Sequence, residues 1–171
     1  MQHSPNSKSG QLPLSAALVA LLVLLDQITK VISVRALYPD RHFILIPGVL
    51  ELTCVQNRGA AFGILQNAQV FFLIITAAAL LVIGYALVRL PADRRYLPVR
   101  ICLCLIAAGA VGNLIDRLLL TYVRDFIYFS LIDFPVFNVA DMYITCATFT
   151  LLFLALFYYK DEHDFDFLSL K

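Results

Sequence analysis

The stretch that decides the fold runs from residue 109 to residue 141 and reads GAVGNLIDRLLLTYVRDFIYFSLIDFPVFNVAD. Long apolar runs flank it on both sides, so its charged side chains and its two asparagines lie at or near a membrane boundary. An ionised side chain costs roughly 2.5–3.5 kcal/mol at a bilayer centre on insertion scales. Charges in this setting therefore indicate a functional site or structural ion pairing. We predict that Asp125 and Asp141 come together as an acid/base pair.

The composition is that of an integral membrane protein. Of the 171 residues, 61% are hydrophobic and 15% are charged, and the mean hydropathy is +0.83. A soluble domain of this size is about half apolar and about one quarter charged. The net charge of +1 gives no electrostatic footprint for nucleic acid, so no such partner is expected. A single membrane domain covering residues 1–171 is expected.

Four segments are long and apolar enough to cross the membrane as helices, since about 20 residues span the hydrocarbon core. The second carries no charge, and four arginines follow it before residue 101. Arginines in short loops mark the cytoplasmic side. We therefore expect both termini and the loop 89–100 to be cytoplasmic, whereas residues 38–69 and Asp125 lie outside. The acidic tail from residue 160 is expected to be exposed. The predicted spans are residues 14–37, 70–88, 101–120 and 138–159.

The outer segment 38–69 is too polar to lie in lipid. A Pro-Gly turn at residues 47–48 separates the β-like run Phe43–Ile46 from residues 49–55, whose polarity alternates with period two. A small hairpin or partial sheet is therefore predicted on the membrane surface. The later segment 121–135, which is rich in Phe and Tyr, is expected to turn back along the outer surface.

Polar side chains in the first span are spaced by one helical turn. Asp26 precedes Lys30 by four residues, which is a favourable order for an ion pair within a helix. One interpretation is a structural ion pair that faces the bundle interior. The other is a polar support that shapes a site near the outer end of the helix.

The third and fourth spans also carry polar side chains that share one face of the helix. Asn113 and Arg117 share one face, and Asp116 beside them can pair with Arg117 or with another helix. Asn138 and Asp141 are three residues apart, so they share a face near the start of the fourth span. These polar groups all fall toward the outer side of the membrane.

Two neighbouring carboxylates offer a specific chemistry. They cannot both ionise at low cost when they are a few ångströms apart, so one keeps a proton while the other stays ionised. Such a pair can deprotonate a water molecule and protonate a leaving amide nitrogen without a serine, a cysteine or a metal ion. Spacing alone leaves open that Asp125 and Asp141 are solvated helix caps.

Metal and cysteine chemistry is not expected. The three histidines fall in separate regions, two of them near the ends of the chain, and no cluster has the spacing of metal ligands. Cys102 and Cys104 are two residues apart inside an apolar run, which fits packing better than a disulfide. No metal and no cofactor is therefore predicted.

The chain resembles the lipoprotein signal peptidases, the type II signal peptidase family of bacterial membranes. Five of its motifs occur in the order found in that family, and together they are specific although each alone is weak. They read DQITK at residues 26–30, NRGAAF at 57–62, GNLIDR at 112–117, DF at 125–126 and FNVAD at 137–141.

The resemblance implies an all-α protein with four transmembrane helices, a small extracytoplasmic β-cradle and a short interfacial helix between the first two spans. It implies an aspartyl endopeptidase of the bacterial inner membrane that cleaves prolipoproteins before a diacylglyceryl-modified cysteine. The expected partners are these lipid-modified prolipoproteins and membrane lipid, and the expected state is a monomer. The implied residues are Asp125 and Asp141 for catalysis, Asn57, Gly59, Asn113, Arg117 and Asn138 for substrate binding, and Asp26, Lys30 and Asp116 for structural support.

Some positions depart from the family pattern. Arg124 stands where many members have an apolar residue, and we expect it to point to lipid headgroups. Ala108 replaces a frequent glycine, and Met142 and Tyr143 are bulky where small residues are common. These differences concern substrate preference. Residues 57–66 are expected to cover the two aspartates and to hold the lipidated cysteine against apolar side chains such as Phe62.

Two other classes of protein were compared with this interpretation. A small proton-coupled transporter or channel component would use intramembrane charges as a relay. Against it, the charges gather toward the outer face and no inverted repeat is seen. A non-enzymatic lipid-binding or assembly protein is the second alternative, and the presence of both Asp125 and Asp141 weighs against it.

Overall fold

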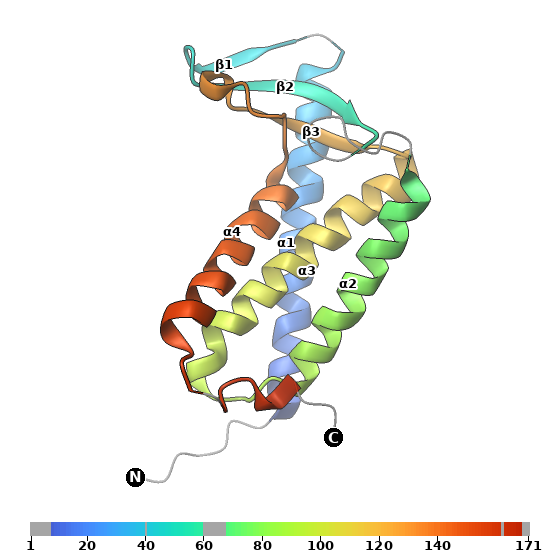
Figure 1. Cartoon of the computed structure of the whole chain (residues 1–171). Coiled ribbons are helices and arrows are strands. Elements are labelled where there is room, and N and C mark those ends of the chain that lie inside the picture. Colours follow the sequence, from blue (N-terminus) through green and yellow to red (C-terminus); the bar gives the residue numbers. More distant parts are fainter. Residues whose placement is uncertain (1–7, 40, 60–67, 162, 169–171) are drawn as a thin grey trace.

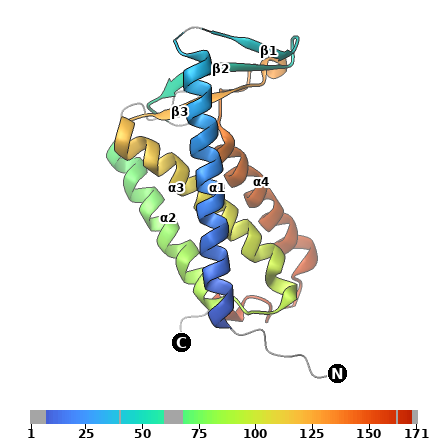
Figure 2. The same cartoon turned by 180° about the vertical axis from the view of Figure 1, so that it is seen from behind.

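The computed structural model describes residues 8–39, 41–59, 68–161 and 163–168. In these residues four helices form an elongated bundle, and a small sheet caps one end of it (Figures 1 and 2). All four helices are long and apolar enough to cross a membrane, which confirms the prediction of four spans. The helices are α1 (Lys8–Leu37), α2 (Gln69–Arg89), α3 (Leu97–Leu120) and α4 (Val139–Phe153).

The ends of the helices follow local sequence signals. Helix α3 begins with Pro98 in its first turn, where the missing backbone N–H has no helical partner to lose. It ends at Thr121, which adopts a left-handed conformation with φ 68°. Helix α4 continues past Phe153 through the π-helical turn Leu154–Tyr158, close to the predicted end of the fourth span.

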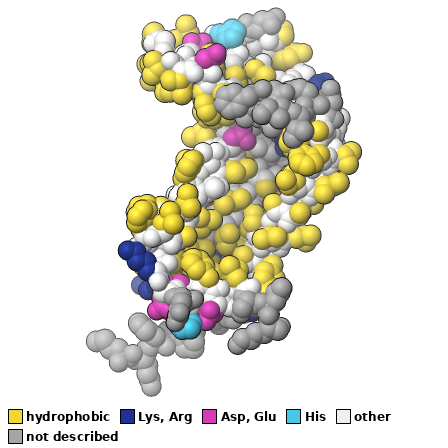
Figure 3. Space-filling model, in the orientation of Figure 1, with side chains coloured by type: hydrophobic (Ala, Val, Ile, Leu, Met, Phe, Trp, Pro, Cys, Tyr) yellow, Lys and Arg dark blue, Asp and Glu magenta, His cyan; other side chains and the backbone are white. Residues whose placement is uncertain are grey.

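Helix α3 is the central helix of the bundle. Half of its span is buried, against 11% for each of the other three, and it contacts α1, α2 and α4. Helices α1, α2 and α4 expose apolar side chains, and the space-filling view shows those on the face where α2 and α4 lie in front of α1 (Figure 3). Two glycines allow the close packing of α3. A Cβ at Gly109 would collide with the Ala140 carbonyl, and a Cβ at Gly112 would collide with the Asp26 carboxylate.

The sheet has three antiparallel strands in the order β1 (Phe43–Ile46), β2 (Leu50–Asn57) and β3 (Val123–Tyr128). The predicted hairpin is present as β1 and β2. The third strand lies in the segment 121–135, where the sequence predicted only a turn. Burial explains the error, because both faces of β3 are covered near its start and its side chains lack a simple polar and apolar alternation.

Strand β3 connects the sheet to the first turn of α4. On one side it pairs with β2, with Asp125 opposite Val55. On the other side the backbone N–H groups of Phe126 and Ile127 both donate to the carbonyl of Phe137, at 3.0 and 2.8 Å. Since Phe137 directly precedes the start of α4, this pairing brings β3 to the helix that carries Asp141.

Most of the described tail residues are exposed, as expected, but Asp164 is buried against the end of the bundle opposite the sheet. Arg95 forms an ion pair with Asp164 at 2.8 Å, and the Tyr96 hydroxyl donates to the carbonyl of Asp164. The rings of Tyr96 and Tyr159 stack with centroids 5.5 Å apart. The short interfacial helix predicted between β2 and α2 would fall within residues 60–67, which lie outside the described residues.

Candidate active site

Asp125 and Asp141 line the same pocket, which lies between the sheet and the adjacent ends of the helices and has a volume of about 590 Å³. Most of its wall is apolar. Figure 3 shows acidic side-chain atoms beneath the sheet. The lining residues are Asn57, Gly59, Phe72, Asn113, Arg117, Val123, Asp125, residues 134–137, Asp141, Met142, Thr145 and Cys146.

Asp125 is held by two amide groups. Its side chain leaves β3 on the face that also carries Val123, and it is 2% exposed. Its Oδ1 accepts a hydrogen bond from Asn138 Nδ2 at 2.6 Å, and its Oδ2 accepts one from Asn57 Nδ2 at 2.9 Å. Burial, and then the nearby Asp141, raise the pKa of Asp125 to about 7, although both amide donors act in the opposite direction.

Asp141 lies in the first turn of α4. It forms a capping box with Asn138, whose Oδ1 accepts from the Asp141 backbone N–H at 3.0 Å. In return, Asp141 Oδ2 accepts from the Asn138 backbone N–H at 3.1 Å, and Asp141 Oδ1 accepts from Asn113 Nδ2 at 2.8 Å. The amino end of a helix also favours negative charge. Both oxygens of this carboxylate therefore accept hydrogen bonds from the protein.

Two asparagines connect the aspartates to each other and to α1. Asn138 Nδ2 lies 3.2 Å from Asn113 Oδ1 as well as 2.6 Å from Asp125. The same Asn113 oxygen accepts from Lys30 Nζ at 2.8 Å. A continuous chain of hydrogen bonds therefore runs from Lys30 through the two amides to both carboxylates.

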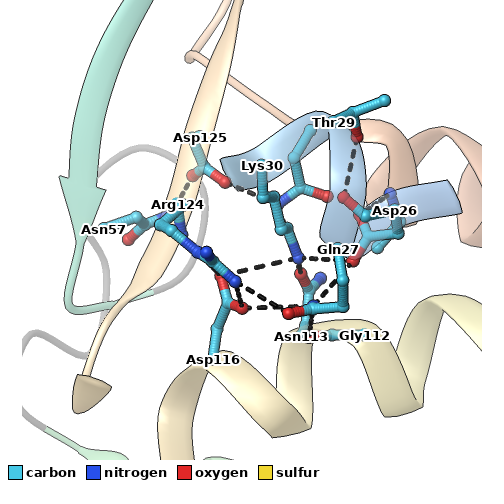
Figure 4. A network of polar contacts seen from close by, with 12 residues as sticks. Asp26, Gln27, Thr29, Lys30, Asn57, Gly112, Asn113, Asp116, Arg124 and Asp125 are labelled. Atoms are coloured by element: carbon cyan, nitrogen blue, oxygen red, sulfur yellow. Dashed lines mark hydrogen bonds and ion pairs between the residues drawn. The ribbon is translucent and has the colours of Figure 1, made fainter. Parts of the chain in front are cut away.

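The polar pair of α1 is a buried ion pair, as one of the two interpretations proposed. Lys30 Nζ lies 2.9 Å from Asp26 Oδ2 and 3.6 Å from Asp116 Oδ2, and all three side chains are 0% exposed (Figure 4). Asp116 therefore pairs with another helix, one of the two options that its sequence position left open. Asp26 Oδ1 also accepts from the backbone N–H of Ala140 at 3.0 Å, which caps the amino end of α4 from outside that helix.

Arg124 does not point to lipid headgroups, and that prediction was wrong. Its guanidinium turns inward to Asp116, with Nη2 2.5 Å from Oδ1, and donates to Gln27 Oε1 at 2.8 Å. Strand geometry gives the reason, since successive side chains point to opposite faces. Because Asp125 faces the pocket, Arg124 must face the other way, where the buried carboxylate of Asp116 needs a counter-charge.

Arg117 forms one side of the pocket. Its guanidinium carbon lies 4.6 Å from the centroid of the Phe72 ring, and its Nη2 lies 3.5 Å from the carbonyl oxygen of Gly59. Gly59 in turn donates its backbone N–H to Asn57 Oδ1 at 2.9 Å. Phe72 and Gln27 were not among the predicted site residues. Gln27 lies between predicted polar positions, whereas an apolar span gives no signal that singles out Phe72.

The structure brings together all ten predicted site residues in the pocket or in the network behind it. The predicted lipid-holding surface around Phe62 lies outside the described residues. Cys102 and Cys104 are buried, which fits their interpretation as packing residues, whereas Cys54 is half-buried and Cys146 is exposed. Within the described parts of the chain, no group of three or more His, Cys, Asp or Glu side chains is placed to hold a metal ion.

Comparisons with known proteins agree on one family. The family model of signal peptidase II matches residues 18–157. A lipoprotein signal peptidase of Caldanaerobacter subterraneus is 43% identical over 145 residues, which cover 84% of this chain and 97% of that protein. One from Streptococcus pyogenes serotype M1 is 48% identical over 136 residues, which cover 77% and 86%.

Solved structures give the same picture. Two bacterial membrane enzyme structures, determined by the in meso method, are each 35% identical to this chain. Their TM-scores are 0.77 and 0.73, and the aligned parts cover 88% and 86% of this chain and 93% and 95% of theirs.

Proposed function

This chain belongs to the signal peptidase II family, and from that premise we propose that it is an aspartyl endopeptidase that removes the signal peptide of prolipoproteins. It is a multi-pass bacterial membrane protein and a peptidase. The family does not favour the alternative of a proton-coupled transporter. The proposed cut lies before the diacylglyceryl-modified cysteine of the substrate.

One observation carries the aspartic type of catalysis. Asp125 and Asp141 line one largely apolar pocket, and Asn138 donates a hydrogen bond to each of them. Burial of this kind lets two carboxylates share one proton, because ionising both would leave two like charges in a medium of low polarity.

We assign the shared proton to Asp125 and the negative charge to Asp141. The pKa of Asp125 is raised to about 7, mainly by burial, so its carboxyl is protonated up to neutral pH. Asp141 sits at the amino end of α4 with hydrogen-bond donors on both oxygens, which stabilises a carboxylate.

The reaction then consumes one water and returns the dyad to its starting state. The Asp141 carboxylate removes a proton from water as the oxygen attacks the scissile carbonyl carbon, while Asp125 donates its proton to the carbonyl oxygen. The tetrahedral intermediate collapses when the amide nitrogen leaves with the proton held by Asp141. Asp125 recovers a proton from the intermediate as the new carboxyl group forms.

The remaining pocket residues bind substrate in this proposal. Arg117 and Gly59 face the peptide, and Asn113 fixes Asp141 for its role as base. The apolar wall formed by Phe72 and residues 134–137 accepts the apolar part of the substrate. Burial of acyl methylenes contributes about 0.8 kcal/mol each, so lipid contributes much of the affinity.

The proposed topology follows from the arginines. Arg89, Arg94, Arg95 and Arg100 lie at or beside the α2–α3 connection, at the end of the bundle opposite the sheet (Figure 1). By the distribution of positive charge this end is cytoplasmic, so both termini are cytoplasmic and the pocket opens toward the extracytoplasmic side. We propose that the chain acts as a single membrane domain and as a monomer, in contact with membrane lipid.

Cleavage of a defined peptide tests the proposal. Purified protein is incubated with a prolipoprotein peptide in a diacylglyceryl-modified form and in an unmodified form, and mass spectrometry locates the cut. We expect cleavage directly before the modified cysteine, with the unmodified peptide cut far more slowly. Asp125→Asn and Asp141→Asn should each abolish cleavage, because an amide cannot exchange the proton that both half-reactions need.

Asp133→Asn is the matched control, since Asp133 is an exposed aspartate between β3 and α4. It should leave cleavage unchanged. Near-parental turnover in either dyad variant would remove that aspartate from the mechanism. Equal cleavage of the two peptides would indicate a general membrane protease instead.

A further inference from the structure

Arg124 is bound to Asp116 at three points. Its backbone N–H and its Nε donate to Asp116 Oδ2 at 3.0 and 3.1 Å, and its Nη2 donates to Asp116 Oδ1 at 2.5 Å. The same Nη2 donates to Gln27 Oε1 at 2.8 Å. Figure 4 shows the side chain directed to these two partners on α3 and α1. Paired contacts of this kind between a guanidinium and a carboxylate fix orientation as well as distance.

This anchor lies next to Asp125 in the chain. Consecutive Cα atoms are about 3.8 Å apart, so any displacement of β3 at Arg124 is passed directly to Asp125. The ladder between β2 and β3 is irregular between Leu52 and Val55, and Val55 is the residue opposite Asp125. Pairing with β2 is regular from Val123 to Asp125 and loses its register beyond Asp125, so the bond between Arg124 and Asp116 adds a restraint at the end of the regular ladder.

Arg124 also balances the buried charges behind the pocket. Asp26, Lys30 and Asp116 are fully buried, and their charges sum to −1. Arg124, whose side chain is 14% exposed, brings the sum to zero. Without it, Lys30 would be the one cation that the described residues provide for the buried carboxylates of Asp26 and Asp116, and uncompensated buried charge is costly.

The charge balance reaches the second aspartate through Lys30. Lys30 Nζ donates to Asn113 Oδ1 at 2.8 Å, and Asn113 Nδ2 donates to Asp141 Oδ1 at 2.8 Å. Lys30 already lies nearer to Asp26, at 2.9 Å, than to Asp116, at 3.6 Å. As long as Arg124 neutralises Asp116, Lys30 is left to orient Asn113 toward Asp141.

We propose that Arg124 is a positioning residue for the cleavage reaction, which sets Asp125 through the strand and Asp141 through Lys30 and Asn113. It touches no substrate in this role. The inference rests on the proposed function of the two aspartates, and it adds a residue from the opposite face of β3.

The test compares Arg124→Met and Arg124→Lys with the parent protein, measuring kcat and KM on the lipidated peptide and the melting temperature in detergent. Misplacement of a reacting group by about 1 Å can cost about 10²-fold in rate, so we expect a loss in kcat of that order for R124M, with KM unchanged. R124K keeps the charge but lacks the planar fork, so its kcat should be intermediate. Arg41 is exposed and lies at the same end of the molecule as Arg124. The variant R41M is therefore the control, and its kcat and KM should match those of the parent.

A double variant separates positioning from general weakening. R124M and Asp116→Asn remove the two ends of one contact, so the combined loss in kcat should be no larger than the larger single loss. If the losses in kcat of the two single variants multiply in the double variant, the proposal is overturned. A kcat of R124M equal to that of the parent would also overturn it. Should R124M fail to fold, R124K carries the test, and parental kcat in that variant would overturn the anchoring role.

The outcome can be told apart from failure of the dyad. If D125N and D141N are inactive while R124M is fully active, only the positioning role of Arg124 is excluded. Active D125N or D141N would remove the proposed mechanism, whatever R124M does.

Discussion

Asn138 and Asp141 bind each other twice at the start of α4. The side chain of Asn138 accepts the Asp141 N–H at 3.0 Å, and the carboxylate of Asp141 accepts the Asn138 N–H at 3.1 Å. The amide of the same Asn138 reaches Asp125 at 2.6 Å. One residue therefore caps a membrane helix and connects both aspartates, so the start of α4 and the geometry of the site cannot vary independently.

Two substitutions of Asn138 should separate its roles. Asn138→Ala removes the helix cap, which costs about 0.5–2 kcal/mol, and also the donor to Asp125. It should lower both the melting temperature and kcat. Asn138→Ser retains a good capping side chain but lacks the amide that reaches Asp125, so kcat should fall while the melting temperature stays near that of the parent. Equal activity in N138S and the parent would mean that the bond to Asp125 has no catalytic role.

Cleavage should decline as the pH rises through about 7. The pKa of Asp125 is raised to about 7 by its burial and by Asp141, and the proposed mechanism needs this carboxyl protonated. Above that pH both carboxylates ionise and the donor is lost, so kcat/KM should fall by about tenfold per pH unit. A profile of kcat/KM against pH that stays flat to about pH 9 would contradict the assignment.

The stability of the folded protein should also fall as the pH rises. The folded pKa of Asp125 lies above its ordinary value of 3.8, so the folded protein holds a proton that the unfolded chain releases between these values. The stabilisation is complete below the unfolded pKa and is lost as the pH rises through the folded one. The melting temperature of the parent should therefore fall more steeply than that of D125N between about pH 4 and about pH 7. Parallel curves for the two proteins would contradict this.

Gly112 and Gly84 form a matched pair for testing the helix contact. A Cβ at Gly112 would meet the Asp26 carboxylate and lie 3.5 Å from the Ala140 Cβ, whereas a Cβ at Gly84 has nothing within 4 Å. Gly112→Ala should destabilise the protein by about 1–3 kcal/mol and reduce activity. Gly84→Ala should be neutral or stabilise by up to about 1 kcal/mol. The measurement is thermal unfolding in detergent, and equal effects of the two changes would argue against close packing at Gly112.

Arg117→Ala should lower kcat/KM by at least about tenfold, because the pocket loses both a charge and the stack on Phe72, worth about 0.5–2 kcal/mol. Arg117→Lys keeps the charge and should lie between the parent and R117A. Arg89 lies over the ring of Tyr85 at 5.7 Å at the opposite end of α2, so Arg89→Ala controls for loss of an arginine on an aromatic ring. Parental kinetics in R117A would exclude Arg117 from substrate binding.

Strong chelation should leave cleavage unchanged. The oxygens of Asp125 and Asp141 accept hydrogen bonds from amide N–H groups, and such donors would repel a cation placed at the same lone pairs. Activity is measured before and after treatment with EDTA. Loss that zinc restores would overturn the metal-independent mechanism.

The helices could be predicted from sequence because lipid imposes a simple rule. A segment of about 20 apolar residues has few alternatives to a helix in a bilayer. The polar positions could also be found, since Asp26, Lys30 and Asp116 are too costly in that setting to lack partners. Periodicity does not predict which residues these polar side chains pair with. It shows which face of a helix a side chain lies on, but not which neighbouring helix packs against that face.

Strand β3 and Arg124 show where this approach stops. The alternation of polar and apolar side chains that identifies a strand requires one solvent-exposed face. Near Asp125 both faces of β3 are covered. Without the strand, Arg124 and Asp125 could not be assigned to opposite sides, and an arginine at a membrane boundary is ordinarily a headgroup contact. Asp116 in the third span carries a charge to which the sequence assigned no single partner, and the structure identifies that partner as Arg124.

The distribution of the buried charges has a consequence for biogenesis. Helix α1 carries Asp26 and Lys30 one turn apart, so it can enter the bilayer with its pair already formed and no net charge at that point. Among the described residues, Asp116 on α3 pairs with a cation of α1 and a cation of β3, a strand that is synthesised after α3. The second cation of Asp116 is therefore available only after α3 has been synthesised. A newly inserted chain becomes a protease only when its last strand and last helix have docked.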